Sequence, residues 1–192
     1  MGTVATFWNS RNLASRWNIG AGNHHYILIV LEAVHLPAAI KTQKHNEVEF
    51  MTLGAFSVGG NMVFEANNAS DSASARDIFN KTPIKDFFNP FDWGTQKHLV
   101  KPPNGNAFQF AATITQFALN YQAETKINPL PYGLFDDNCA AWVNTLFKVA
   151  GISAAERVRL GQFWGIDAAE QLEIPEELFK SESYVSRSYI RR

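Results

Sequence analysis

Residues 135–151 read FDDNCAAWVNTLFKVAG and contain the only cysteine of the chain, Cys139. Apolar residues, Val143 and Phe147 among them, recur after it at the three- and four-residue spacing of a helix. Asn138 and the two aspartates before it suit an N-cap, and a glycine suited to a left-handed C-terminal residue follows the pattern. The sequence therefore predicts that Cys139 opens a helix.

The start of a helix favours the reactive form of a cysteine. The first turn presents unpaired backbone N–H groups and the positive end of the helix dipole, and both lower the pKa of a thiol. A lone cysteine is more often a small buried apolar residue, so this position alone does not establish catalysis. A cysteine nucleophile also needs a base, which the rest of the chain has to supply.

Size and composition predict a single globular domain over residues 1–192 with many aromatic side chains. With 17 Lys and Arg against 18 Asp and Glu, the net charge is −1, so charge does not favour binding to nucleic acid or to an anionic membrane. One cysteine excludes an internal disulfide and a cysteine-based zinc site, and the five histidines are scattered. We therefore expect no metal and no cofactor.

Neither a secretory signal nor a membrane span is predicted. Residues 1–22 contain charged side chains and no uninterrupted apolar segment. The longest apolar run, residues 26–31, is too short to cross a bilayer. We expect synthesis in the cytoplasm without a cleaved signal, so that any export would use a dedicated secretion system.

The hydrophobic pattern predicts an α+β fold with an antiparallel sheet flanked by helices. Residues 24–34, rich in Ile, Val and Leu, are predicted as a buried central strand. Residues 48–58 and 62–66 are predicted as a hairpin around a Gly-Gly-Asn turn, and residues 107–125 as an amphipathic helix. The remaining segments are predicted as a short helix with Phe7, Leu13 and Trp17 on its apolar side, a polar connection over 41–47, a loop over 67–74, a short helix over 75–80, an irregular aromatic loop over 83–106, helices that begin near Ser153 and Pro175, and a polar tail over 181–192.

Two histidines are placed to meet the cysteine. His24 and His25 open the predicted central strand, where a side chain can face the N-terminus of a helix packed on the sheet. Histidine is the usual base for a cysteine because its pKa lies near neutrality. Alternation along a strand puts the two side chains on opposite faces, so only one of them can reach Cys139.

Two motifs carry a resemblance to a known family. The sequence NHHYILIV at residues 23–30 resembles the histidine strand, and YGLFDDNCAAWV at residues 132–143 resembles the Asn-Cys helix, of the circularly permuted NlpC-like branch of the papain-like cysteine enzymes. The histidine precedes the cysteine, as in that branch and in the reverse of papain order. Lecithin:retinol acyltransferase-like proteins and several bacterial effector toxins are similar. The resemblance implies a papain-like fold.

The resemblance also implies a set of catalytic residues. Cys139 is the expected nucleophile, and His25 is the expected base because an aromatic residue follows it at the strand start, as in the family. His24 remains the alternative base. Family members orient the imidazole with a third polar residue, often on a neighbouring strand. Glu65 resembles that residue, while Glu49 competes for the role.

The resemblance implies a Cys–His hydrolase as the first expected function. The expected substrate is a peptidoglycan peptide amide bond, cleaved through a thioacyl-enzyme by a bacterial effector toxin of the kind delivered by type VI secretion, with an immunity protein as partner. A lipid acyltransferase or phospholipase of the same fold is the second expectation, favoured by the aromatic residues between Phe87 and Trp93. The third is a binding module in which Cys139 is inert.

Overall fold

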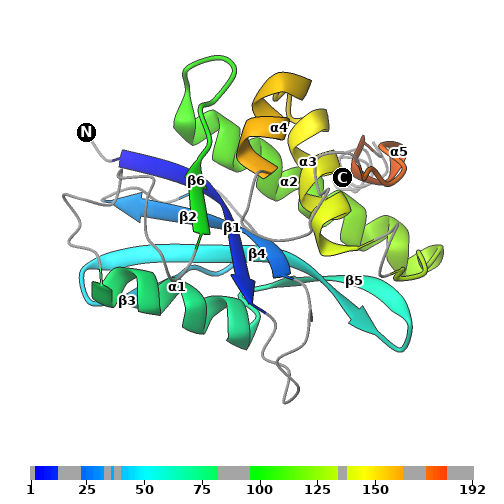
Figure 1. Cartoon of the computed structure of the whole chain (residues 1–192), viewed down its shortest axis with the longest axis horizontal. Helices are drawn as coiled ribbons and strands as arrows, with labels where there is room; N and C mark the ends of the chain where they lie inside the picture. The colour runs from blue at the N-terminus through cyan, green and yellow to red at the C-terminus, as the bar shows by residue number, and fades with distance from the viewer. Residues whose placement is uncertain are drawn as a thin grey trace, which may run out of the picture.

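The computed structural model describes residues 3–12, 23–32, 36, 40–81, 96–133, 138–161 and 172–180. Within these ranges the chain forms an α+β fold with one six-stranded antiparallel sheet and helices on both of its faces (Figure 1). The predicted fold class, an antiparallel sheet flanked by helices, is therefore confirmed. The strands are β1 (Thr3–Asn12), β2 (Asn23–Glu32), β3 (Gln43–His45), β4 (Val48–Val58), β5 (Asn61–Ala66) and β6 (Gln96–Leu99). The helices are α1 (Ala69–Lys81), α2 (Ala107–Ile127), α3 (Cys139–Val149), α4 (Ala154–Gly161) and α5 (Glu177–Lys180).

The strand order is β3-β4-β2-β1-β6, which places β2 at the centre of the sheet as predicted. The strand β4 pairs with β2 only as far as Tyr26↔Gly54, while on its other edge Leu53–Val58 pair with β5. The first residues of β2 are therefore hydrogen-bonded as a ladder to β1, where Ser10 lies opposite His25 and Arg11 opposite His24. The sheet opens at the start of β2, on the side that β4 has left.

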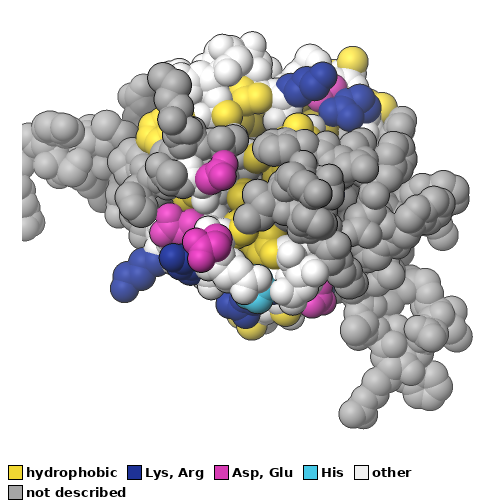
Figure 2. Space-filling view, turned by 90° about the vertical axis from the view of Figure 1, so that its left-hand side faces the viewer, with side chains coloured by type: hydrophobic (Ala, Val, Ile, Leu, Met, Phe, Trp, Pro, Cys, Tyr) yellow, Lys and Arg dark blue, Asp and Glu magenta, His cyan; other side chains and the backbone are white. Residues whose placement is uncertain are grey.

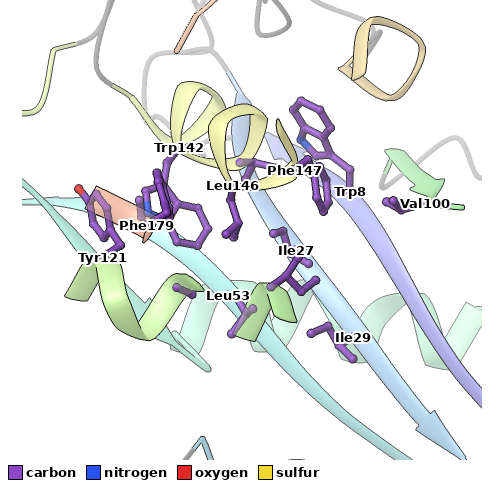
Figure 3. Close-up of a cluster of buried hydrophobic side chains, with 14 of the residues drawn as sticks. Trp8, Ile27, Ile29, Leu53, Val100, Tyr121, Trp142, Leu146, Phe147 and Phe179 are labelled. Atoms are coloured by element: carbon purple, nitrogen blue, oxygen red, sulfur yellow. The ribbon is translucent and has the colours of Figure 1, made fainter. Parts of the chain in front are cut away.

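The two faces of the sheet carry separate hydrophobic clusters. Helices α2, α3 and α5 lie on one face and α1 on the other (Figure 1). The larger cluster joins the first face to these helices, and Figure 3 shows Ile27 and Leu53 of the sheet directed toward Leu146 of α3. The smaller cluster includes Phe7 and Leu28 and packs under α1. Alternation along β2 separates the two sets, because neighbouring side chains of a strand point to opposite faces.

Helix α3 is the most deeply buried helix segment of the larger cluster. Every residue from Cys139 to Phe147 is buried, and the two polar ones, Asn144 and Thr145, are hydrogen-bonded to backbone groups of the segment that contains Leu172 and Ile174. Trp142 packs against the rings of Tyr121 and Phe179, at centroid distances of 6.0 Å each. The segment around Phe179 also donates the backbone N–H of Ile174 to Thr145 Oγ1 of α3 at 2.9 Å. Neighbouring elements thus hold α3 on several sides.

Several predicted elements are confirmed. The turn between β4 and β5 has positive φ at Gly59 and Gly60, 59° and 81°, which suits the tight hairpin predicted there. Helix α2 covers the predicted helix, and Gly151 ends α3 with a φ of 89°. The backbone N–H of Glu156 is bonded to Ser153 Oγ at the start of α4, as the predicted capping box requires.

Other predictions about local structure are wrong. Residues 3–12 form β1 in place of a short helix, because Val4 and Trp8 pack on one face while Ala5 and Phe7 pack on the other. A strand buried on both faces lacks the polar alternation that would reveal it. The strands β3 and β6 lie within segments predicted as irregular. Helix α1 begins at Ala69, six residues before its predicted start, in a stretch rich in Asn and Ser. Residues 13–22, 82–95 and 181–192, with the predictions made for them, lie outside the described residues.

Surface charge is mixed on the side of the molecule drawn in Figure 2. Among its coloured atoms, acidic and basic side chains lie close together, with apolar atoms between them. None of the helices in the described part of the chain is long and apolar enough to span a membrane.

Candidate active site

The site begins at the N-terminus of α3, where Asn138 caps the helix. Asn138 is extended, with a φ of −131°, and its Oδ1 accepts the backbone N–H groups of Ala140 and Ala141 at 2.9 and 3.0 Å. The predicted cap is therefore confirmed. Cys139 is the first residue of the helix and is 5% exposed. Its position combines the positive end of the helix dipole with a low dielectric, so charges close to the sulfur act strongly on it.

The sulfur lies against the open start of β2. The backbone N–H of His25 donates to Cys139 Sγ at 3.4 Å, within the range for a bond to sulfur. This N–H lies one residue beyond the last β2–β4 pair, where the ladder no longer uses that edge of the strand. A strand edge and a helix N-terminus therefore both direct N–H dipoles toward the same thiol, an arrangement that stabilises a thiolate.

The imidazole that meets Cys139 is that of His24. Interaction with this ring lowers the pKa of the Cys139 thiol, and its Nε2 lies 3.3 Å from Asp71 Oδ2. The ring of Phe56 stacks on the imidazole at a centroid distance of 4.5 Å and fixes its plane. Cys139, His24 and Asp71 thus form a continuous chain of nucleophile, imidazole and carboxylate, the order in which a base is oriented and made more basic in cysteine and serine hydrolases.

Asp71 comes from α1, on the opposite face of the sheet from α3. It is wholly buried, and its second oxygen, Oδ1, accepts from Arg11 Nε at 2.8 Å. Gly54 of β4 makes room for it, because a Cβ at that position would lie 2.8 Å from Asp71 Oδ2. The two helices reach the same imidazole because His24 lies at the start of β2, where the sheet has opened.

The ionisation of the pair follows from these contacts. Burial disfavours the charged form of His24, but the hydrogen bonds to Asp71 and Cys139 outweigh it and raise its pKa to about 9. Burial would raise the pKa of the Cys139 thiol, but the hydrogen bond and positive charge of His24 outweigh burial and lower it. The backbone N–H of His25 lowers the thiol pKa further. These contacts favour the thiolate–imidazolium form of the pair over the neutral form.

Tyr132 is the remaining group at the sulfur. Its backbone is fixed to the β4–β5 hairpin, since its N–H donates to Gly60 O at 2.8 Å and Pro131 bridges to Asn61. Its hydroxyl interacts with Cys139 strongly enough to affect the pKa of the thiol and its own. Burial and the negative charge on Cys139 raise the pKa of Tyr132, so the phenol stays protonated and donates to the thiolate.

The structure gives His24 and His25 different surroundings. The Nδ1 atom of His25 accepts from Trp8 Nε1 at 3.0 Å, on the face of the sheet covered by α2 and α3. An indole N–H can only donate, so this nitrogen carries no proton and is already used as an acceptor. The side chain of His25 is engaged with Trp8, while its backbone serves Cys139. The geometry therefore favours His24 as the base, the alternative left open by the sequence.

The carboxylate that orients the imidazole is Asp71, which sequence reasoning missed. Glu65 Oε2 accepts from Asn68 Nδ2 at 2.6 Å, and Glu49 Oε1 accepts from Thr42 Oγ1 at 3.1 Å. Asp71 lies in the Asn- and Ser-rich stretch predicted as a loop, 47 residues from His24. Asp71 lies in the first turn of α1, a position that could have marked it as a candidate. The predicted helix began at residue 75, so this position was not recognised.

Among the described residues, no group of three or more His, Cys, Asp or Glu side chains is arranged to hold a metal ion. Comparison of the chain with protein-family models, with curated proteins and with solved structures returns no match. The chemistry of the site therefore rests on the arrangement of its own side chains, around a thiol with a lowered pKa.

Proposed function

We propose that the protein is a cysteine hydrolase in which Cys139 is the nucleophile, His24 the general base and acid, and Asp71 the residue that orients the imidazole. The observation that carries the proposal is the chain of contacts from the thiol through His24 to a buried carboxylate. Depression of a cysteine pKa by a paired histidine is the usual means of activating this nucleophile. The Asn-Cys and histidine motifs, which resemble the permuted NlpC-like enzymes, also support it.

The proposed reaction proceeds in two steps. The Cys139 thiolate attacks the carbonyl carbon of an amide or ester, and the carbonyl oxygen becomes an oxyanion as the C–S bond forms. His24 donates its proton to the leaving amine or alcohol, and the thioacyl-enzyme remains. A water molecule then gives a proton to His24 and attacks the thioester, which releases the acid and restores the thiolate. This sequence uses His24 as acid first and as base second.

Two donors beside the sulfur are proposed to serve the oxyanion. The backbone N–H of Cys139 and the hydroxyl of Tyr132 both lie beside the sulfur, and the N-cap uses the N–H groups of the next two residues instead. As the thiolate loses its charge to the new C–S bond, the phenol proton is free to turn to the oxyanion. Such preorganised donors account for a large part of catalysis in acyl transfer.

Peptidoglycan peptide amide bonds are the proposed substrate, and this choice rests on the resemblance. The test is digestion of purified sacculi by the wild type and by Cys139→Ala, with muropeptides analysed by mass spectrometry. New peptide ends with the wild type alone are expected. Phospholipid vesicles form a second arm, in which released fatty acid without muropeptide change would favour the lipid enzyme. Products from neither substrate, together with an ordinary thiol pKa at Cys139, would overturn the hydrolase and favour a binding module.

A further inference from the structure

Arg11 is a charged residue at the site that the proposed reaction does not use. It lies opposite His24 in the β1–β2 register, and its Nε donates to Asp71 Oδ1 at 2.8 Å. The side chain of Arg11 is 19% exposed, while that of Asp71 is 0% exposed. The two carboxylate oxygens are divided between two cations, Oδ1 with Arg11 and Oδ2 with His24 at 3.3 Å.

In the proposed reaction, the carboxylate of Asp71 needs a counter-ion whose own charge is permanent. A wholly buried carboxylate remains an anion only while a cation faces it, because desolvation otherwise favours its neutral form. His24 cannot be that cation throughout, since it gives up its proton to the leaving group. The guanidinium of Arg11 keeps its charge at every working pH. It can therefore hold the charge of Asp71 while His24 alternates between its two forms.

Arg11 also fixes the direction of the carboxylate. The carboxylate group of Asp71 is planar and rigid, so a bond that fixes Oδ1 also limits where Oδ2 can point. Gly54 lies close to Oδ2, since a Cβ added at Gly54 would lie 2.8 Å from that oxygen. Asp71 is thus held by a charged hydrogen bond at one oxygen and by close packing at the other. Both contacts leave Oδ2 directed at His24 Nε2.

We propose that Arg11 is a positioning residue, which pairs with the buried carboxylate of Asp71, directs it at His24 and so acts on Cys139 only through Asp71. This inference rests on the proposed function, because it concerns the same thiol and imidazole. It adds a fourth residue to the arrangement and assigns it a role distinct from a positive charge near the thiolate. A cation that acted directly on Cys139 would lower the thiol pKa whether or not Asp71 carried charge.

A double-mutant cycle separates the two roles. The readout is the pKa of Cys139, followed by the ultraviolet absorbance of its thiolate, with Cys139→Ala as the blank; the signal is specific because the chain has one cysteine. Arg11→Met is expected to raise the thiol pKa by about one unit. At pH values below the thiol pKa, the fraction of thiolate would then be roughly tenfold lower. In the Asp71→Asn background the same change is expected to add less than about 0.3 unit, which is the non-additivity of residues that act as one unit.

Matched variants control for charge and for folding. Arg76→Met removes an arginine from the exposed side of α1, where its Nη2 donates to Gln43 Oε1, and is expected to leave the thiol pKa unchanged. Arg11→Lys keeps the cation and is expected to restore more than half of the shift. Each variant is compared by circular dichroism and thermal melting, and Asp71→Ser replaces Asp71→Asn if the latter does not fold.

Two results would overturn the inference. One is a wild-type thiol pKa in Arg11→Met, which needs no variant of Asp71. The other is an equal shift from Arg11→Met in the wild-type and in the Asp71→Asn backgrounds, which would mean that the arginine acts by its charge alone. Failure of the proposed function looks different, since the wild type itself would then show a thiol pKa near 8.5 that does not respond to His24→Gln.

Discussion

The two faces of the central sheet have interiors of different kinds. The face toward α2, α3 and α5 is filled by apolar and aromatic side chains, such as Trp8, Ile27 and Trp142 (Figure 3). The face toward α1 has a smaller apolar cluster and, at the end of the strands, a buried group of charges around Asp71. The sheet therefore separates the large apolar core on one face from the charged groups of the candidate site on the other. Cys139 links the two faces, because it belongs to a helix on the first face and interacts with a histidine on the second.

The largest expected effect is on packing at the apolar face. Phe179→Ala removes a ring that is 0% exposed and in contact with Trp142 and Tyr121, and such truncations cost about 3–5 kcal/mol of the free energy of unfolding. Chemical denaturation measures the loss. The thiol pKa of the protein that remains folded is expected to stay at its wild-type value. Phe108→Ala, at a ring 40% exposed, is the matched control and should change stability by less than about 0.5 kcal/mol.

The next effect concerns the face that carries the charges. His24→Gln is expected to raise the pKa of Cys139 and to slow its alkylation by iodoacetamide at pH 7 by about tenfold or more, because the thiolate loses its cation. His25→Gln keeps the backbone N–H that meets the sulfur and should shift the thiol pKa by less than about half a unit, a difference under ~1 kcal/mol. A larger shift from His25→Gln than from His24→Gln would restore His25 as the base.

A smaller effect is expected from closing the space beside Asp71. In Gly54→Ala the new methyl group would lie 2.8 Å from Asp71 Oδ2 and 3.1 Å from the ring of Phe56, so both must shift. Overpacking of this kind costs about 1–3 kcal/mol, and displacement of the carboxylate is expected to lower the pKa of His24. Histidine resonances followed by NMR titration measure that pKa. An unchanged His24 pKa in a destabilised protein would show that the carboxylate moves without weakening its bond to the ring.

The last prediction concerns the pH dependence of stability at this face. Because the pKa of His24 is about 9 in the folded protein against 6.5 without its contacts, its protonated form contributes stability that is fully present below pH 6.5. That contribution is expected to fall as the pH rises through about 9. The measurement is the difference in free energy of unfolding between the wild type and His24→Gln from pH 6 to 10. A difference that grows with pH would contradict the protonated state assigned to His24.

The elements that could be predicted from the sequence are those whose signals are local. The start of α3 followed from a cap, an apolar period and a glycine, all within 17 residues, and β2 followed from one apolar run. Strand β1 could not be predicted, because a strand buried on both faces has no polar alternation. Over so short a stretch, its apolar residues fit the spacing of one helix face equally well. The strand pattern placed His24 and His25 on opposite faces, but which of them meets the thiol depends on where the pairing of β4 with β2 ends. Asp71 could not be predicted either, since its partners come from β1 and β2, distant in the chain.

The paired charges at the start of β2 have a consequence for how the protein responds to its medium. When the Cys139–His24 pair is ionised, Arg11 and His24 are the cations of the group and Asp71 and the thiolate its anions, and all four side chains are largely or wholly out of water. Dissolved ions screen exposed charges over about 8 Å at physiological ionic strength and act far less on buried pairs. A neutral, enclosed set also projects little field beyond itself. The pKa of Cys139 is therefore expected to be nearly independent of salt concentration, so that the thiol would react at similar rates at low and at high ionic strength.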